Sequence, residues 1–166
     1  FEESKCDYFS FCEGDDYYLS TDRLNKHLTL QTKNPNIFLS FNNIIIKYQE
    51  SNNYEIFQPQ NISAPYTTEK LVANNYIGNF SCCFYNSYLI KYINKDIFDF
   101  YTVDWFFNIF CSQYGDIGYI KEPLSVYRIH KNGSWSSLTE TKKILSLIKY
   151  IDIYNKYLKF TYDKYF

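Results

Sequence analysis

The sequence predicts a mixed α/β fold in which a sheet is flanked by helices, and two patterns carry this prediction. Runs of β-branched and aromatic residues, such as Ile37 to Tyr48, are typical of strands. Apolar residues recur at helical spacing between Thr102 and Tyr114 and again after Thr139. Of the 166 residues, 46% are hydrophobic and 21% charged, which is ordinary for a globular protein and argues against wholesale disorder.

The first elements are a strand and a helix. Aromatic side chains alternate over residues 8–12, which predicts a buried strand that ends at the acidic segment Glu13–Asp16. A helix capped by Ser20 or Thr21 should follow and end at Asn34-Pro35, because proline cannot continue a helix. On this helix His27 has polar neighbours and is expected to be exposed. Three other positions follow helical spacing: Leu24, Leu28 and Gln31.

The middle of the chain predicts further strands. Ile37 to Tyr48 forms one or two of them, and the polar stretch from Gln49 to Pro65 forms a loop or a ragged hairpin. Thr67 or Thr68 can cap a short helix through Leu71. A strand is expected from Phe80 to Tyr85.

The last third predicts two helices around two short strands. Gly115 should be the C′ residue of the helix over 102–114. Strands over 117–120 and 124–129 are expected to be parted by Pro123, and a loop over 131–137 follows them. From Thr139 an amphipathic helix begins, with lysines beside this apolar series: Ile144, Leu147, Ile148, Ile151, Tyr154 and Leu158.

Composition excludes several functional classes. A net charge of −1 and a pI near 6.1 leave no broad basic surface, so we expect no nucleic acid partner. No apolar run approaches the roughly 18 residues of a transmembrane helix. Five cysteines match no zinc-binding spacing, which favours a reducing, cytoplasmic compartment with Cys82 and Cys83 as buried thiols. The chain begins at Phe1 and has no methionine, so we expect a fragment of a longer protein.

The acidic segment holds three carboxylates in four residues: Glu13, Asp15 and Asp16, with Gly14 between them. Their mutual repulsion would be relieved by a divalent cation such as Mg²⁺ or Mn²⁺, which prefers oxygen ligands. Gly14 would let the chain turn sharply and let a phosphate approach the backbone. The alternative is a solvated acidic turn that precedes a helix.

Two more segments carry candidate chemistry. Asp104 opens the aromatic helix, where it either complements the helix dipole or, partly desolvated beside Trp105, serves as a general base. Alternation along the strand over 126–130 places Arg128 and His130 on the same side. That pair suits a diphosphate, and His130 could ligate a metal; the alternative is an ordinary surface strand end.

Taken together, these segments resemble glycosyltransferase family 2. Glu13-Gly14-Asp15-Asp16-Tyr17-Tyr18 is similar to the metal-binding motif of a subset of that family, and Asp104-Trp105 is similar to its catalytic-base motif. The segments over 115–120 and 126–130, followed by Gly133-Ser134-Trp135-Ser136, resemble its closing segment. The resemblance covers roughly residues 8 to 137. Val103 stands where many members have an acidic residue.

The resemblance implies a partial GT-A fold, which is Rossmann-like, without its N-terminal nucleotide-binding half. Residues 1–137 would be the C-terminal part of that domain and 138–166 an amphipathic helix. The implied activity is the inverting transfer of a sugar from a nucleotide diphosphate sugar to a carbohydrate or lipid-linked acceptor. Asp15 and His130 would hold Mn²⁺ or Mg²⁺, and Asp104 would be the general base. Four residues would contact the nucleotide: Glu13, Gly14, Asp16 and Arg128.

Two other interpretations remain open at this stage. One is a non-catalytic carbohydrate- or partner-binding module, in which Trp105 and Trp135 stack on sugar rings. The other, compatible with a transferase, is that the lysine-rich C-terminal helix lies on an anionic membrane surface. Missing upstream strands would expose a sheet edge and invite self-association.

Overall fold

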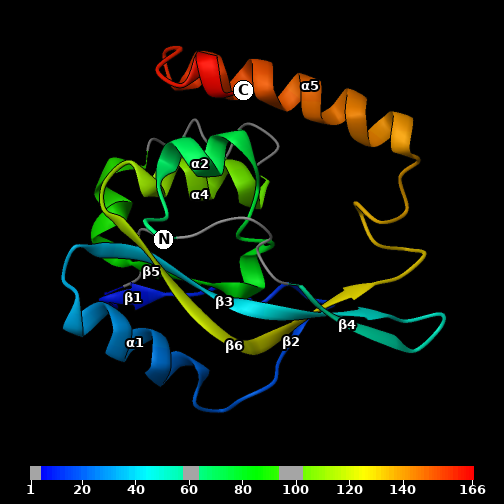
Figure 1. Ribbon diagram of the computed structural model, residues 1–166, viewed down its shortest axis with the longest axis horizontal. Coiled ribbons are helices and arrows are strands. Elements are labelled where there is room, and N and C mark those ends of the chain that lie inside the picture. The colour runs from blue at the N-terminus through cyan, green and yellow to red at the C-terminus, as the bar shows by residue number, and fades with distance from the viewer. Residues whose placement is uncertain (1–4, 58–63, 94–102) are drawn as a thin grey trace.

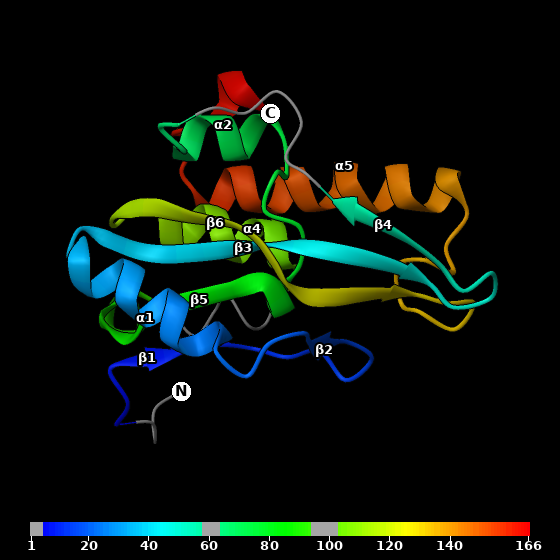
Figure 2. The ribbon, with the colours of Figure 1, turned by 60° about the horizontal axis from the view of Figure 1, so that its bottom comes forward.

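A computed structural model describes residues 5–57, 64–93 and 103–166. The described residues contain a six-stranded mixed sheet. Helices lie on both faces of the sheet, as Figures 1 and 2 show, which confirms the predicted α/β class. Helix α1 (Arg23–Lys33) covers one face. The other face carries α2 (Thr68–Ala73), α4 (Asp104–Ser112) and α5 (Glu140–Tyr157).

The strand order is β1-β5-β3-β6-β2, and β4 pairs with the outer part of β3. Among the strands of the described residues, only β3 and β6 are parallel to each other; the remaining pairs are antiparallel. The bounds are β1 (Tyr8–Phe9), β2 (Tyr17–Tyr18), β3 (Ile37–Tyr48), β4 (Asn53–Phe57), β5 (Cys83–Asn86) and β6 (Asp116–Ile129). Because β1 and β2 lie at opposite ends of this order, the chain between them, which includes the acidic segment, passes from one edge of the sheet to the other.

Strand β6 corrects the prediction of two strands parted by Pro123. It runs without a break from Asp116 to Ile129, parallel to β3. The register shifts beside Pro123: Asn42 lies opposite Ile120, and the next residue of β3 lies opposite Pro123. A local irregularity of this kind accommodates a residue that lacks an N–H donor, so the strand continues past the proline.

Helix α1 overturns two expectations from the sequence. Leu24 and Leu28 face outward and are 47% and 37% exposed, whereas Arg23 and His27 are fully buried. His27 was predicted to be exposed, and that prediction is wrong. The reason is the sheet beneath, which presents Ser40 and Asn42 to the helix and so selects polar partners. The expected cap is wrong too: Asp22 holds the cap position and makes no side-chain capping bond.

The buried interface under α1 is a hydrogen-bonded network. Asn42 Oδ1 accepts from Arg23 Nε at 2.9 Å and from His27 Nε2 at 3.1 Å. Ser40 Oγ lies 2.9 Å from His27 Nδ1 and accepts from Gln31 Nε2. Burial and the nearby Arg23 charge lower the pKa of His27 to about 3, so the imidazole is neutral.

The opposite face of the sheet holds the aromatic core. The rings of Phe106 and Tyr154 stack with centroids 3.7 Å apart and join α4 to α5. Cys82 and Cys83 are buried, as predicted, and the five cysteines are free thiols. Within the described residues, no helix is long and apolar enough to cross a membrane.

The remaining boundaries mostly agree with the sequence, except that the buried strand predicted over 8–12 is limited to Tyr8–Phe9 and is half-buried. Thr67 and Thr139 cap α2 and α5 through their side chains. The predicted hairpin after Gln49 forms as β4, and residues 58–63 lie outside the described part. Thr102 also lies outside it, and α4 begins at Asp104. The predicted strand from Phe80 begins three residues later, after a 3₁₀ turn. The described residues include 3₁₀ turns at Phe80–Cys82, Ser87–Tyr92 and Asp163–Tyr165.

Gly115 is required by a close approach and not by a helix C′ position, since α4 has its C-cap at Gln113. A Cβ atom on Gly115 would lie 2.7 Å from both the carbonyl oxygen of Asn36 and the ring of Phe38. We expect Gly115→Ala to lower the free energy of unfolding by about 1–3 kcal/mol in urea titrations, because overpacking displaces neighbours. Gly14→Ala is the matched control, because its Cβ would meet nothing within 4 Å. Equal losses in the two variants would contradict this account.

Candidate functional site

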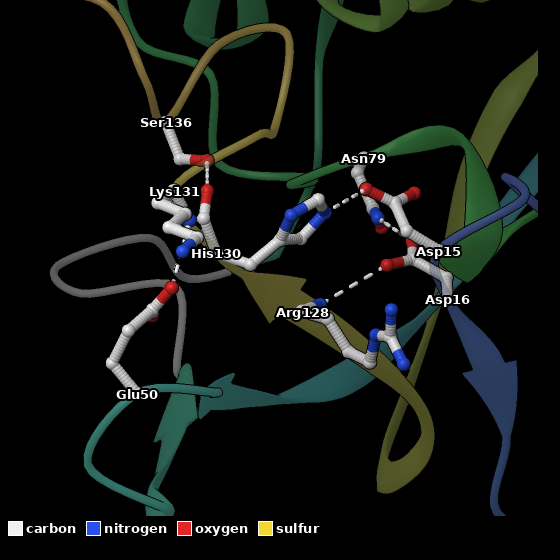
Figure 3. Close-up of polar contacts among 8 residues, drawn as sticks. All are labelled: Asp15, Asp16, Glu50, Asn79, Arg128, His130, Lys131 and Ser136. Atoms are coloured by element: carbon white, nitrogen blue, oxygen red, sulfur yellow. Dashed lines mark hydrogen bonds and ion pairs between the residues drawn. The ribbon is translucent and has the colours of Figure 1, made fainter.

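The candidate site lies where the acidic segment passes the C-terminal end of β6. Asp15 and Asp16 follow β1, while Arg128 and His130 come from the end of β6 and the residue just after it. Figure 3 shows the two carboxylates turned toward this strand end, with Asn79 beside them. The pairing of Tyr17 with Val126 joins β2 to β6 and holds the acidic segment at this position.

Asp15 and His130 form a direct contact. The Nε2–H of His130 donates to Asp15 Oδ2 at 2.9 Å (Figure 3). The His130 carbonyl accepts hydrogen bonds from the Ser136 hydroxyl at 2.8 Å and from the backbone N–H of Gly133 at 3.0 Å. These bonds fold the 131–137 loop back on the end of β6, and Glu50 secures it further by accepting from the Lys131 N–H. The imidazole is therefore held by a well-tethered backbone.

Asp16 is held by groups on both sides. Its Oδ1 accepts from the backbone N–H of Arg128 at 3.1 Å, and its Oδ2 accepts from the side-chain amide of Asn79 (Figure 3). Burial raises the pKa of Asp16, although its hydrogen bonds oppose that shift. Arg128 therefore contacts the acidic segment through its backbone. Its guanidinium Nε is buried and has no hydrogen-bond partner within the described residues.

Glu13 and Asp104 lie close enough to repel each other. Loss of solvent around the Glu13 carboxyl group, together with the negative charges of Asp104, Asp16 and Asp15, raises the pKa of Glu13 to about 7. Burial raises the pKa of Asp104 to about 7, although its carboxylate accepts a hydrogen bond from the backbone N–H of Trp105. The fold thus brings the start of α4 beside the acidic segment.

Three residues join the site without having been predicted. Burial, together with the charges of Glu13, Asp104, Asp16 and Asp15, raises the pKa of Tyr127 to about 12. Asn79 holds Asp16, and the Ser81 hydroxyl accepts from the backbone N–H of Glu13 at 3.0 Å. For Asn79 and Ser81, the sequence gives only one signal: both are polar residues just before the apolar run of β5.

Gly14 lies in the open part of the acidic segment. The space where its Cβ would stand is empty to 4 Å, so the turn does not depend on glycine for packing. That space is the side from which a ligand could reach the backbone. The structure thus assembles side chains from the acidic segment, α4 and β6.

The side chains of the site can be compared with the ligands that a divalent cation requires. Within the part of the chain that the structure describes, no group of three or more His, Cys, Asp or Glu side chains could hold a metal ion. Asp15 Oδ2 and His130 Nε2 lie 2.9 Å apart, and in the imidazole tautomer with its proton on Nδ1 both atoms could bind one ion in place of their hydrogen bond. Magnesium is typically bound by one or two carboxylates together with substrate phosphates, so a two-residue site fits an ion that arrives with a diphosphate. Burial and the neighbouring carboxylates raise the pKa of Glu13 to about 7, and a cation at this position would oppose that shift.

Comparison with known proteins finds long but weak similarity. No family model matches the chain. Uncharacterized proteins of Mycobacterium bovis (Mb1547) and Mycobacterium tuberculosis (Rv1520) are each 25% identical over 138 residues, which is 82% of this chain and 39% of the relative. The chain therefore spans about two fifths of the length of these curated relatives.

From the raised pKa of Asp104 we predict how the stability of the protein depends on pH. Between the ordinary aspartate value near 4 and its folded value of about 7, the folded state keeps a proton that the unfolded state has released. Stability should therefore fall as the pH rises through this window and level off above it. Asp104→Asn should reduce that fall, so that the difference in melting temperature between about pH 5 and about pH 8 shrinks by several degrees.

Thermal unfolding at the two pH values measures the effect. Asp152→Asn, which removes an exposed carboxylate of α5, controls for the loss of one negative charge. An unchanged pH dependence in Asp104→Asn would show that this carboxyl group has an ordinary pKa in the folded protein.

Proposed function

We propose that this protein acts as an inverting glycosyltransferase that uses a nucleotide diphosphate sugar and a divalent cation. One observation carries the proposal: Asp104, distant in sequence, lies close enough to the acidic segment for its charge to raise the pKa values of Glu13 and Tyr127. Such a transfer needs a cation site and a proton acceptor on two sides of one sugar. The weak similarity to uncharacterized relatives adds nothing on activity.

Asp15 and His130 are the residues that would hold Mn²⁺ or Mg²⁺. When bound, the ion would stabilise the negative charge that develops on the departing diphosphate. Arg128 would contact a phosphate through its guanidinium, whose buried Nε has no hydrogen-bond partner within the described residues. Glu13 and Asp16 would contact the nucleotide, and the empty space at Gly14 would admit it to the backbone.

Asp104 would accept the proton of the acceptor hydroxyl. The hydroxyl oxygen then forms a bond to the anomeric carbon while the bond from that carbon to the phosphate oxygen breaks. The electron pair of that bond leaves with the nucleoside diphosphate, and attack from the opposite face inverts the configuration. A pKa of about 7 suits a base that must be deprotonated at neutral pH yet bind a proton in the transition state.

The proposal is tested by calorimetric titration of the intact protein with UDP and with GDP, each with Mn²⁺ and with chelator. We expect one nucleotide to bind only with the cation, and Asp15→Ala to weaken that binding at least about 100-fold, which is at the upper end for a lost charged contact. Asp152→Asn, which replaces an exposed carboxylate of α5, is the control and should bind the nucleotide as the wild type does. Cation-independent binding, or none, would overturn the proposal.

A second candidate is a non-catalytic carbohydrate-binding module, because Trp135, in the loop over 131–137, is 37% exposed. Trp105 supports it less, since its indole N–H donates to the Leu71 carbonyl and its ring packs on Phe106. This alternative predicts that sugars bind equally well in chelator and that Trp135→Ala abolishes the binding.

A further inference from the structure

The outward face of α5 carries an apolar stripe that nothing in the described structure covers. Ile144, Leu145 and Ile148 are 56%, 61% and 60% exposed, and we call them the α5 stripe. The inward contacts of α5 are concentrated toward its C-terminal half, where Tyr154 stacks on Phe106. In Figures 1 and 2 the N-terminal half of α5 extends beyond α2 and α4, so the stripe lies on a projecting part of the molecule.

Positive charge accompanies the α5 stripe. At 3.6 residues per turn, Lys142 and Lys149 lie on the same side of the helix, next to the stripe. Neither lysine forms an ion pair within the described residues, whereas Lys143 pairs with Glu140 and Lys156 with Asp152. The part of α5 from Lys142 to Lys149 therefore presents two uncompensated ammonium groups beside three exposed aliphatic side chains.

We propose that this face of α5 binds the surface of an anionic phospholipid bilayer. Aliphatic side chains on one helix face can enter the boundary between head groups and acyl chains, while adjacent lysines contact anionic head groups. A protein partner with an apolar groove would satisfy the stripe but would give the two lysines no defined role unless it were also acidic. The charge thus favours the bilayer. The proposal is independent of the transferase proposal, because α5 contributes none of the site residues.

Vesicle flotation of the intact protein tests the proposal. The vesicles are phosphatidylcholine alone or phosphatidylcholine with about one third phosphatidylglycerol. We expect binding to the anionic vesicles only. The double variant Lys142→Gln, Lys149→Gln should weaken binding roughly thirty-fold, because each lysine near an anionic membrane surface contributes a similar attraction and two of them are lost. Replacing the three residues of the α5 stripe by Gln should weaken it at least about a hundred-fold through lost apolar burial.

Ile56→Gln on β4 is the matched control, because Ile56 is 55% exposed and lies far from α5 in sequence. It should bind anionic vesicles as the wild type does, and circular dichroism should show all variants to be folded. Equal binding to both kinds of vesicle, or unchanged binding in either α5 variant, would overturn the proposal. The proposal would also be overturned if the wild type bound no vesicles but formed a dimer that the Gln variants did not form. In that case a second copy of this chain would cover the α5 stripe.

Discussion

Asp104→Asn should lower the rate of sugar transfer by about 10²- to 10⁴-fold, the usual contribution of a positioned general base. The amide matches the carboxylate in shape but cannot take the proton of the acceptor hydroxyl. Binding of the nucleoside diphosphate with Mn²⁺ should remain within about two-fold, because Asp104 is placed on the acceptor side in the proposed reaction. The rate is measured as release of UDP or GDP from a panel of nucleotide sugars.

The paired measurement separates this role from a structural one. Asp15→Ala should lose both nucleotide binding and transfer, whereas Asp104→Asn should lose transfer alone. Asp152→Asn, on the outer side of α5, should change neither quantity. Full activity in Asp104→Asn would remove the general base from the proposed mechanism, even if metal-dependent nucleotide binding were found.

Arg23→Ala should destabilise the protein by about 3–5 kcal/mol, because it removes three hydrogen bonds from the buried interface and opens a cavity. The guanidinium is fully buried and donates to Asn42 Oδ1, to Ser10 Oγ at 3.1 Å and to the carbonyl of Cys83 at 2.9 Å. It also lies 4.3 Å from the ring centroid of Tyr18. Urea denaturation measures the loss.

The position of Arg23 also links the core to the site. Ser10 precedes the acidic segment and Tyr18 follows it, so the guanidinium contacts both of its flanks. Lys26→Ala is the control: this neighbouring cation of α1 forms only an exposed ion pair with Glu122, worth at most about 1 kcal/mol. A comparable small loss in Arg23→Ala would show that solvent or another donor replaces the guanidinium.

Local patterns in the sequence were sufficient for the mixed α/β class and for most element positions. The caps at Thr67 and Thr139 and the long strand over Ile37 to Tyr48 were predictable because capping bonds and β-branched runs act over a few residues. The candidate residues Asp15, Asp104 and His130 were recognisable by their chemistry and order. Their roles remain predictions that the experiments above test.

The inner face of α1 could not be read from the sequence. Leu24 and Leu28 carry the apolar spacing, yet the helix turns Arg23 and His27 toward the sheet, because Ser40 and Asn42 on β3 supply their hydrogen bonds. A helix pattern describes one element alone, whereas the face that is buried depends on what the neighbouring element offers. The continuity of β6 past Pro123 has the same origin, since pairing with β3 absorbs the irregularity.

The sequence by itself determined which side chains are available: the carboxylates of the acidic segment, Asp104 at the start of a helix, and Arg128 with His130 at the end of a strand. Only the tertiary structure decided that they meet, and that Asn79, Ser81 and Tyr127 join them. The physical reason is that these residues come from distant parts of the sequence, and strand order and packing set their separation in space. The strength of a charge interaction, such as that between Glu13 and Asp104, depends on that separation.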